Sequence, residues 1–234
     1  MQNIAIILSG GMGTRMGDTI PKQFFKVAGK TVIEHTVDAF EQNKNIDEIA
    51  IVINPLFVST IENMQISNRW EKVKKILNGG EHRYESSLNA INAYSNLGDC
   101  NLIFHDAVRP LVTQRIIDDV VIALKSYNAV DVAIPATDTI IQTNDNGQFI
   151  TNIPDRKYLQ RSQTPQGFKL SVIAEAYKNA LQDVNFMATD DCGIVLRYLP
   201  NEKIFIVRGE ESNMKLTYKE DTFLLDKLFS ITAL

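Results

Sequence analysis

The stretch Ile4-Ala5-Ile6-Ile7-Leu8-Ser9-Gly10-Gly11-Met12-Gly13-Thr14-Arg15 joins an apolar run directly to a glycine-rich loop. The apolar run is typical of a buried strand, and the glycines let backbone N–H groups approach an anion without a Cβ in the way. Arg15, together with the lysine of Pro21-Lys22-Gln23-Phe24, brings two cations to the same region. The stretch therefore predicts a strand that leads into a polyphosphate site, and the chain is expected to bind a nucleotide.

Short β-branched runs alternate with longer amphipathic stretches along the rest of the chain. Strands are expected at residues 4–8, 48–53, 74–77, 102–105, 131–135 and 203–207, and helices at residues 31–41, 58–68, 83–94, 113–126, 171–181, 190–199 and 219–228. This alternation predicts an α/β fold with a Rossmann-like, mainly parallel sheet and helices on both faces, in a single domain over residues 1–234. Loops that follow the strands should converge at the carboxyl edge of the sheet.

One segment in the middle of the chain interrupts the alternation. Residues 138–143 and 148–153 flank Asn144-Asp145-Asn146-Gly147, which is a strong signal for a β-hairpin. A two-stranded hairpin on its own is only marginally stable in water. Residues 138–156 are therefore expected to form a protruding arm that packs against a second subunit and makes a homodimer, and the alternative is an arm folded back on its own domain.

Composition excludes several classes of function. The net charge of −4 argues against a nucleic-acid surface, which is normally basic. The two cysteines form no C-x-x-C pair, so neither a disulfide framework nor a zinc site is expected. No apolar run approaches the roughly 20 residues of a membrane span, and no signal peptide is evident. The chain is expected to be cytoplasmic and to bind no membrane.

Two familiar nucleotide motifs do not match the first loop. A Walker A loop requires Gly before the lysine, and Lys22 follows Pro21. A dinucleotide fingerprint that starts at Gly11 requires a sixth-place glycine, where this chain has Met16. The loop therefore belongs to another class of phosphate-binding sequence.

The pattern G-x-G-T-R-M followed by P-K resembles the signature loop of sugar-phosphate nucleotidyltransferases. Further motifs follow in family order: Gly79-Gly80-Glu81-His82-Arg83-Tyr84-Glu85-Ser86, His105-Asp106-Ala107-Val108-Arg109-Pro110, Asp138-Thr139, Asp155-Arg156, Gln163-Thr164-Pro165-Gln166, Thr189-Asp190-Asp191 and Asn213-Met214-Lys215-Leu216-Thr217. Over nearly its whole length the chain resembles the cytidylyltransferases that act on methylerythritol 4-phosphate or on ribitol 5-phosphate. The resemblance implies transfer of a cytidylyl group from CTP to a sugar-alcohol phosphate, with Mg²⁺ bound mainly through the CTP phosphates.

The resemblance also assigns roles to individual residues. It implies three catalytic cations: Arg15, Lys22 and Lys215. It implies CTP contacts at Ser9, Gly10, Gly11, Gly13, Thr14, Gly79, Gly80, Glu81, Arg83, Ser86 and Asp106, the last of which is also the candidate metal ligand. It implies acceptor contacts at Arg109, Thr139, Arg156, Thr164 and Asp190, with Thr139 and Arg156 reaching the neighbouring subunit's site.

Elementary chemistry agrees with this set of residues. Attack on phosphorus adds negative charge to the non-bridging oxygens, which fixed cations stabilise as it develops. The attacking phosphate oxygen is already anionic, so the site needs positioning and charge neutralisation rather than a general base. His105 is accordingly expected to be a packed residue at a strand end and not a base.

The acceptor is the open question at this stage. Residues 128–135 and 216–221 are closer to the pentitol-phosphate branch, and Thr189-Asp190-Asp191-Cys192 departs from the Thr-Asp-Glu-Ala run of the methylerythritol branch. Ribitol 5-phosphate is therefore favoured, with CDP-ribitol serving a surface polysaccharide. Methylerythritol 4-phosphate, an isoprenoid precursor, is the alternative. A second alternative is a catalytically silent nucleotide-binding regulatory module on the same fold.

Overall fold

The computed structural model describes residues 1–11, 20–187 and 190–232. Its centre is an eight-stranded sheet in the order β10-β7-β11-β6-β1-β4-β5, with β12 beside β7. The strands are β1 (Asn3–Ser9), β4 (Glu48–Ile53), β5 (Val73–Asn78), β6 (Asn101–Asp106), β7 (Ala129–Pro135), β10 (Gln160–Ser162), β11 (Gln166–Lys169) and β12 (Ile204–Arg208). Only β10 and β11 run antiparallel to their neighbours in this sheet, so the predicted mainly parallel sheet is confirmed.

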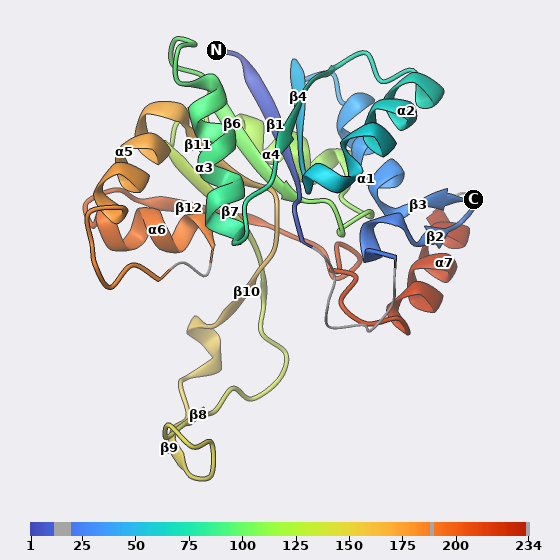
Figure 1. The fold of residues 1–234 in the computed structure, drawn as a ribbon. Helices are drawn as coiled ribbons and strands as arrows, with labels where there is room; N and C mark the ends of the chain where they lie inside the picture. The colour runs from blue at the N-terminus through green and yellow to red at the C-terminus, as the bar shows by residue number, and fades with distance from the viewer. Residues whose placement is uncertain (12–19, 188–189, 233–234) are drawn as a thin grey trace.

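Helices cover both faces of the sheet, as predicted (Figure 1). One face carries α1 (Val32–Glu41), α2 (Val58–Asn68) and α4 (Gln114–Ala123). The other carries α3 (Arg83–Tyr94), α5 (Leu170–Ala180) and α6 (Asp191–Tyr198). The last helix, α7 (Asp221–Thr232), lies apart from both layers, beside the small ribbon of β2 (Lys26–Val27) and β3 (Lys30–Thr31).

The N-terminal apolar run is continuous because β1 is buried on both sides. Ala5 and Ile7 pack into the core under α1 and α4, whereas Ile4 and Ile6 pack into the core under α3 and α5. All four side chains are fully buried. Burial of each isoleucine contributes roughly 1.5–3 kcal/mol, so this strand anchors the loop that follows it.

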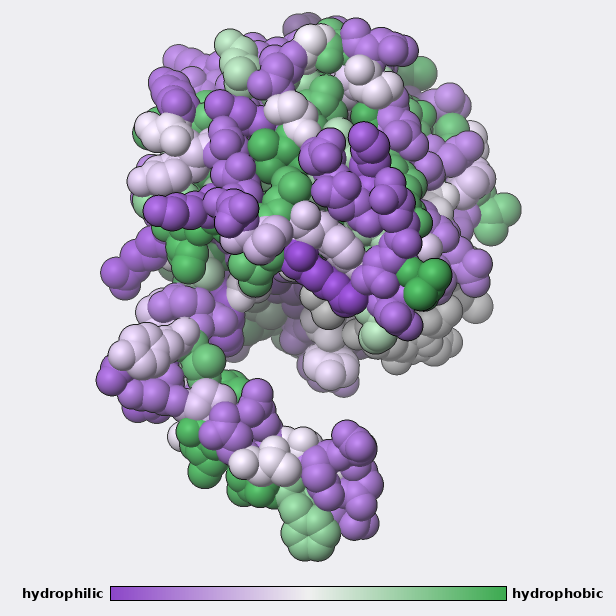
Figure 2. Space-filling model, turned by 90° about the vertical axis from the view of Figure 1, so that its left-hand side faces the viewer, coloured by the Kyte–Doolittle hydropathy of each residue, from purple (hydrophilic) through white to green (hydrophobic). Residues whose placement is uncertain are grey.

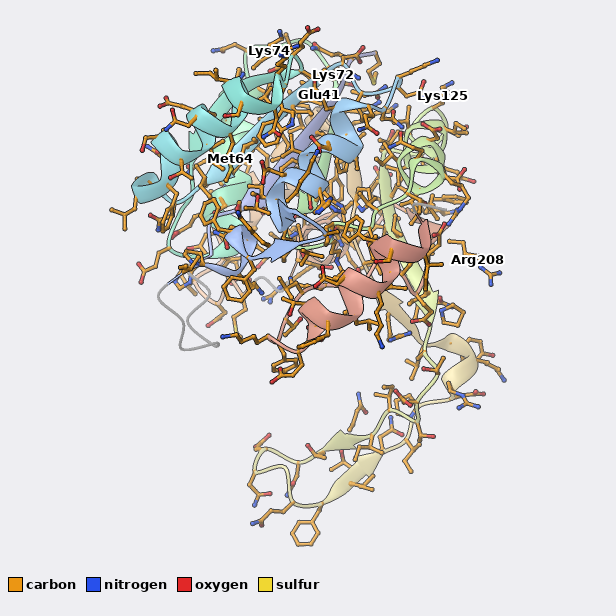
Figure 3. The ribbon with its side chains drawn as sticks, turned by 90° about the vertical axis from the view of Figure 1, so that its right-hand side faces the viewer. Glu41, Met64, Lys72, Lys74, Lys125 and Arg208 are labelled. Carbon is orange, nitrogen blue, oxygen red and sulfur yellow. The ribbon has the colours of Figure 1, made fainter. Side chains whose placement is uncertain are left out.

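The predicted hairpin exists but its ladder is short. β8 (Gln142–Thr143) pairs with β9 (Ile150–Asn152), and Gly147 at the turn has a φ of +72°, which favours glycine. The arm leaves the body after the carboxyl end of β7 and projects into open space (Figures 1 and 3). The alternative of an arm folded back on its own domain is therefore wrong.

The arm carries exposed apolar side chains along its length, several of which are visible in Figure 2. They are Ile140, Ile141, Phe149, Ile150, Ile153 and Tyr158, each between 43% and 76% exposed. An exposed group of apolar side chains on a slender hairpin is typical of a surface that another chain covers. Dimerisation through this arm stays a prediction.

None of the helices in the described ranges combines the length and apolarity that crossing a membrane requires.

Candidate active site

A cavity of about 290 Å³ lies at the carboxyl ends of β1 and β6. Five separate segments line it: the loop after β1, the 3-10 turn Lys22–Phe24, the β5–α3 loop with the start of α3, the end of β6, and the loop before α7. The residues that both line it and were expected from sequence to bind CTP or to catalyse are Ser9, Gly10, Gly11, Lys22, Gly80, Glu81, Arg83, Ser86, Asp106 and Lys215. Gly13, Thr14 and Arg15 lie outside the described residues.

The glycines allow two loops to pack backbone against backbone at the mouth of this cavity. A Cβ on Gly79 would lie 3.0 Å from Cα of Gly10, and a Cβ on Gly80 would lie 2.2 Å from Cβ of Glu85. The N–H of Gly80 donates to Oγ of Ser86 at 3.1 Å, which ties the second loop to the first turn of α3. Backbone groups therefore approach the cavity as a small planar base requires.

Gln23 holds the start of the first loop through side-chain hydrogen bonds, and it was not predicted as a site residue. Its side chain is 2% exposed, and Nε2 donates at 3.2 Å to the carbonyl oxygens of both Ser9 and Gly11. The amide thus fixes the carbonyls at the start of the loop. The one signal in the sequence is its place directly after Lys22.

Asp106 is the electrostatic centre of the cavity. Nζ of Lys215 lies 2.7 Å from Oδ2 of Asp106, and Nε of Arg109 and Nε of Arg83 lie 3.8 and 4.0 Å from the carboxylate. Burial opposes ionisation, but Lys215, Arg83 and Arg109 outweigh it and hold the pKa of Asp106 at about 2. The carboxylate is therefore charged at any working pH and gathers cations from three segments.

Arg83 is held in place by a second carboxylate, Asp191, which the sequence analysis did not predict as a site residue. Its Nη1 lies 2.7 Å from Oδ2 of Asp191, whose side chain is fully buried. The hydroxyl of Tyr177 donates to the other oxygen, Oδ1, at 2.6 Å. Burial lowers the pKa of Arg83, but the attraction of Asp191 and Asp106 more than reverses this effect. Asp191 thereby positions Arg83 at the edge of the cavity.

Asn213 fastens the loop that carries Lys215. Its carbonyl accepts from Nη1 of Arg109 at 2.8 Å, and its own Nδ2 donates to the carbonyl of Thr164 at 2.8 Å. Asn213 is fully buried, so these bonds are shielded from water. The arrangement fixes Lys215 and Arg109 relative to one another on the side of the cavity next to Asp106.

His105 is a packed strand-end residue, as predicted. It is fully buried, its Nε2–H donates to the carbonyl of Arg109, and its Nδ1 accepts from the hydroxyl of Thr164. That hydroxyl in turn accepts from the N–H of Asp106 at 3.2 Å. Thr164, predicted to contact the acceptor, therefore uses its hydroxyl to position the backbone of Asp106, and its contact with an acceptor stays a prediction.

Stability at acidic pH should depend on His105. Burial lowers its pKa from 6.5 to about 4 in the folded protein. Between these values the unfolded chain binds a proton at this residue and the folded chain does not, so stability decreases as the pH falls through this window. The free energy of unfolding should drop by on the order of 3 kcal/mol from this group alone. Urea unfolding at pH 7 and pH 4 should show a smaller drop for His105→Gln, and equal drops would contradict the assignment.

The remaining predicted acceptor residues do not line the cavity in this chain. Thr139 and Arg156 are exposed on or beside the arm, where Nη1 of Arg156 donates to the carbonyl of Thr137. Asp190 caps α6 by accepting from the N–H of Gly193 at 2.7 Å. Roles for these residues toward an acceptor stay predictions.

The donor set fits a magnesium ion that is bound mainly by a ligand. The described residues contain no cluster of three side chains able to hold a metal. Asp106 supplies one carboxylate at the cavity wall. Mg²⁺ retains waters and uses one or two carboxylates together with substrate phosphates, so a single carboxylate matches that mode of binding.

Comparison with known proteins agrees with this geometry. The model of the 2-C-methyl-D-erythritol 4-phosphate cytidylyltransferase family matches residues 3–229. The chain is 47% identical over 229 residues to the bifunctional ribulose 5-phosphate reductase/CDP-ribitol pyrophosphorylase Bcs1 of Haemophilus influenzae; the match covers 97% of this chain but only 48% of that protein. It is 43% identical over 228 residues to the 2-C-methyl-D-erythritol 4-phosphate cytidylyltransferase of Thermobifida fusca, covering 96% and 92% of the two chains. The 4-diphosphocytidyl-2C-methyl-D-erythritol synthase of Anaerococcus prevotii has the same fold, with a TM-score of 0.85, 27% identity and 98% coverage of both chains.

Proposed function

Because the chain belongs to the 2-C-methyl-D-erythritol 4-phosphate cytidylyltransferase family, we propose that it transfers a cytidylyl group from CTP to D-ribitol 5-phosphate. The products are CDP-ribitol and pyrophosphate. The 47% sequence identity to a protein named for CDP-ribitol pyrophosphorylase activity supports this acceptor, and the chain spans about half of that protein's length. So do residues 128–135 and 216–221, which favour the pentitol-phosphate branch.

One observation carries the proposal: Lys22 and Lys215 come from opposite ends of the chain and line the same cavity as the glycine loops. A phosphate oxygen of the acceptor attacks the α-phosphorus of CTP, and the bond from that phosphorus to the oxygen of the departing pyrophosphate breaks. Charge builds on the non-bridging oxygens during this step. The two ammonium groups stabilise it, and no proton has to be removed from the nucleophile.

Two supporting roles follow within the same site. The loop around Gly79 and Gly80 and the side chain of Ser86 offer close backbone and a short polar group for the cytosine ring. Mg²⁺, held by Asp106 and mainly by the phosphates of CTP, would neutralise phosphate charge when bound. The arm is the proposed dimer contact, and Thr139 and Arg156 would contact the acceptor phosphate in the partner's site.

A second candidate acceptor is 2-C-methyl-D-erythritol 4-phosphate. The matching family model and the 43% identical relative carry its name. Measurement of pyrophosphate release from CTP with each acceptor decides between the two. Release with ribitol 5-phosphate alone supports the proposal, and release with methylerythritol 4-phosphate alone replaces it. No release with either acceptor would favour a silent nucleotide-binding module.

Lys22→Ala should lower kcat more than tenfold, equivalent to a loss of more than about 1.4 kcal/mol of transition-state stabilisation. Lys22 is one of the two described lysines that line the cavity. The substitution therefore removes a positive charge from the place where the triphosphate is expected. Steady-state pyrophosphate release measures the effect, with circular dichroism to confirm the fold. A kcat within tenfold of wild type would remove Lys22 from the catalytic set.

A further inference from the structure

A second polar cluster lies beyond the cavity and is not used in the chemistry described above. It is formed by Asp131 on β7, Gln166 on β11 and Asp190 at the cap of α6, and is called here the Asp131–Gln166–Asp190 cluster. Nε2 of Gln166 donates to Oδ1 of Asp131 at 3.0 Å and to Oδ2 of Asp190 at 2.9 Å. Both carboxylates are half-buried. Two carboxylates that are bridged by one buried amide next to an apolar core need a reason.

The amide of Gln166 is only half satisfied. Its side chain is 1% exposed, and Oε1 has no hydrogen-bond partner among the described residues. A buried carbonyl oxygen without a donor is costly, and a ligand hydroxyl that reached Oε1 would remove that cost. Asp131 also has capacity to spare: Ser162, Gln166 and the N–H of Val132 all reach its Oδ1, which leaves Oδ2.

The cluster lies on the same side of the sheet as the catalytic carboxylate. Gln166 pairs with Phe104 across β11 and β6, and Asp106 follows Phe104 by two residues. Directly paired residues and residues two apart share a face, so the side chains of Gln166 and Asp106 point the same way as diagonal neighbours, on the order of 7 Å apart. The short chain of a pentitol can span that distance.

A second connection runs through the start of α6. Asp190 contacts Gln166, and its neighbour Asp191 contacts Arg83, which lines the cavity. The two consecutive carboxylates thus face different sites: one holds a cation of the cavity and the other belongs to the cluster. The cluster is therefore adjacent to the place where the acceptor must lie during transfer.

The chemistry of the cluster fits hydroxyl groups and disfavours phosphate. Each hydrogen-bond donor that reaches Asp131 or Asp190 from the described residues is neutral: a serine hydroxyl, a glutamine amide or a backbone N–H. Carboxylate oxygens accept hydrogen bonds from O–H donors, and they disfavour an anionic phosphate. Burial raises the pKa of Asp131, and its carboxylate in turn favours the charged form of Arg109, so the cluster lies within electrostatic reach of the cations around Asp106. An acceptor would therefore place its phosphate toward Arg109 and Lys215.

We propose that the Asp131–Gln166–Asp190 cluster binds the hydroxyl groups at the end of the acceptor remote from its phosphate, and that Asp131 selects an unbranched pentitol over a methyl-branched tetritol. The proposal rests on the proposed function and specifies its acceptor. Hydroxyl groups replace the water that a carboxylate loses on ligand binding, and the methyl-branched tetritol has a shorter chain with one hydroxyl group fewer than the pentitol, so it offers Asp131 one donor fewer.

The test uses Asp131→Asn and Asp131→Val in the full chain, and the control is Asp119→Asn, which changes a partly exposed aspartate on α4 that pairs with Arg115. KM for ribitol 5-phosphate should rise at least tenfold in both variants, while KM for CTP stays within twofold of wild type. The preference in kcat/KM for ribitol 5-phosphate over 2-C-methyl-D-erythritol 4-phosphate should fall at least tenfold. Asp119→Asn should match wild type in all three quantities.

Singly deoxygenated ribitol 5-phosphates with the wild-type enzyme test the same contact without a variant that must fold. At least one should raise KM tenfold or more, and that analogue should lose no further affinity in Asp131→Asn. The inference would be overturned if KM stayed within twofold of the value for wild type with ribitol 5-phosphate, either for every analogue or for both Asp131 variants. In that case turnover by the wild-type enzyme would still support the proposed function. A shifted magnesium requirement with unchanged acceptor KM would also overturn it. No wild-type turnover with either acceptor would overturn both.

Discussion

Lys215→Ala is expected to lower kcat by about 10²–10³-fold, equivalent to about 2.7–4 kcal/mol of transition-state stabilisation. Two effects add. The variant loses the ammonium that lines the cavity where charge develops, and it leaves Asp106 without its nearest cation, at 2.7 Å. Asp106 keeps Arg83 and Arg109 as neighbours but then repels the phosphates of the substrate more strongly. Single-turnover pyrophosphate release measures the chemical step, and KM for CTP should change less than kcat.

The matched control is Lys178→Ala, which removes an exposed lysine from α5. It should leave kcat within twofold of wild type, because Lys178 does not line the cavity. If Lys215→Ala kept kcat within tenfold while its thermal unfolding matched wild type, the assignment of Lys215 to the transition state would be wrong.

Asp191→Ala is expected to lower the free energy of unfolding by about 3 kcal/mol. The change leaves the guanidinium of Arg83 without its closest anion and the buried hydroxyl of Tyr177 without an acceptor. The Arg83 side chain remains 31% exposed, so water compensates part of the loss and the effect falls at the low end of the range for a broken buried pair. Urea unfolding monitored by circular dichroism measures it.

A double variant separates the lost pairing from lost packing. Asp191→Leu combined with Arg83→Met replaces the pair with apolar groups, and it should recover much of the stability lost in Asp191→Ala. The double variant should still bind CTP poorly, because Arg83 lines the cavity. Failure to recover any stability would show that the loss comes from the packing of α6 and not from an unpaired charge.

Patterns in the sequence predict the parts of the fold where one periodicity dominates. β1 follows from a continuous apolar run, and the bounds expected for the helices of residues 58–68 and 83–94 agree with α2 and α3. β11 does not follow in the same way, because Gln166-Gly167-Phe168-Lys169 is only four residues long and comes directly after Pro165. A strand that short depends on its neighbours β6 and β7 rather than on its own pattern.

The candidate site also contains residues that the sequence predicts and residues that it does not. The residues that carry a motif, such as Lys22, Asp106 and Lys215, are predictable and gather in one cavity. The residues that position them are not, because their roles depend on helix phase and tertiary contact. Asp190 and Asp191 are adjacent and chemically identical, yet one caps α6 and the other is fully buried against Arg83. The amino-acid sequence alone does not distinguish these two roles.

The position of Asp106 among its cations has a consequence for discrimination between anions in the cell. Lys215, Arg83 and Arg109 already have a counter-ion that is attached to the protein and cannot diffuse away. A stray orthophosphate or carboxylate metabolite must compete with this tethered anion at its high local concentration. A ligand that also contacts the glycine loops can offset that competition, so the pairing disfavours small anions that bind through charge alone.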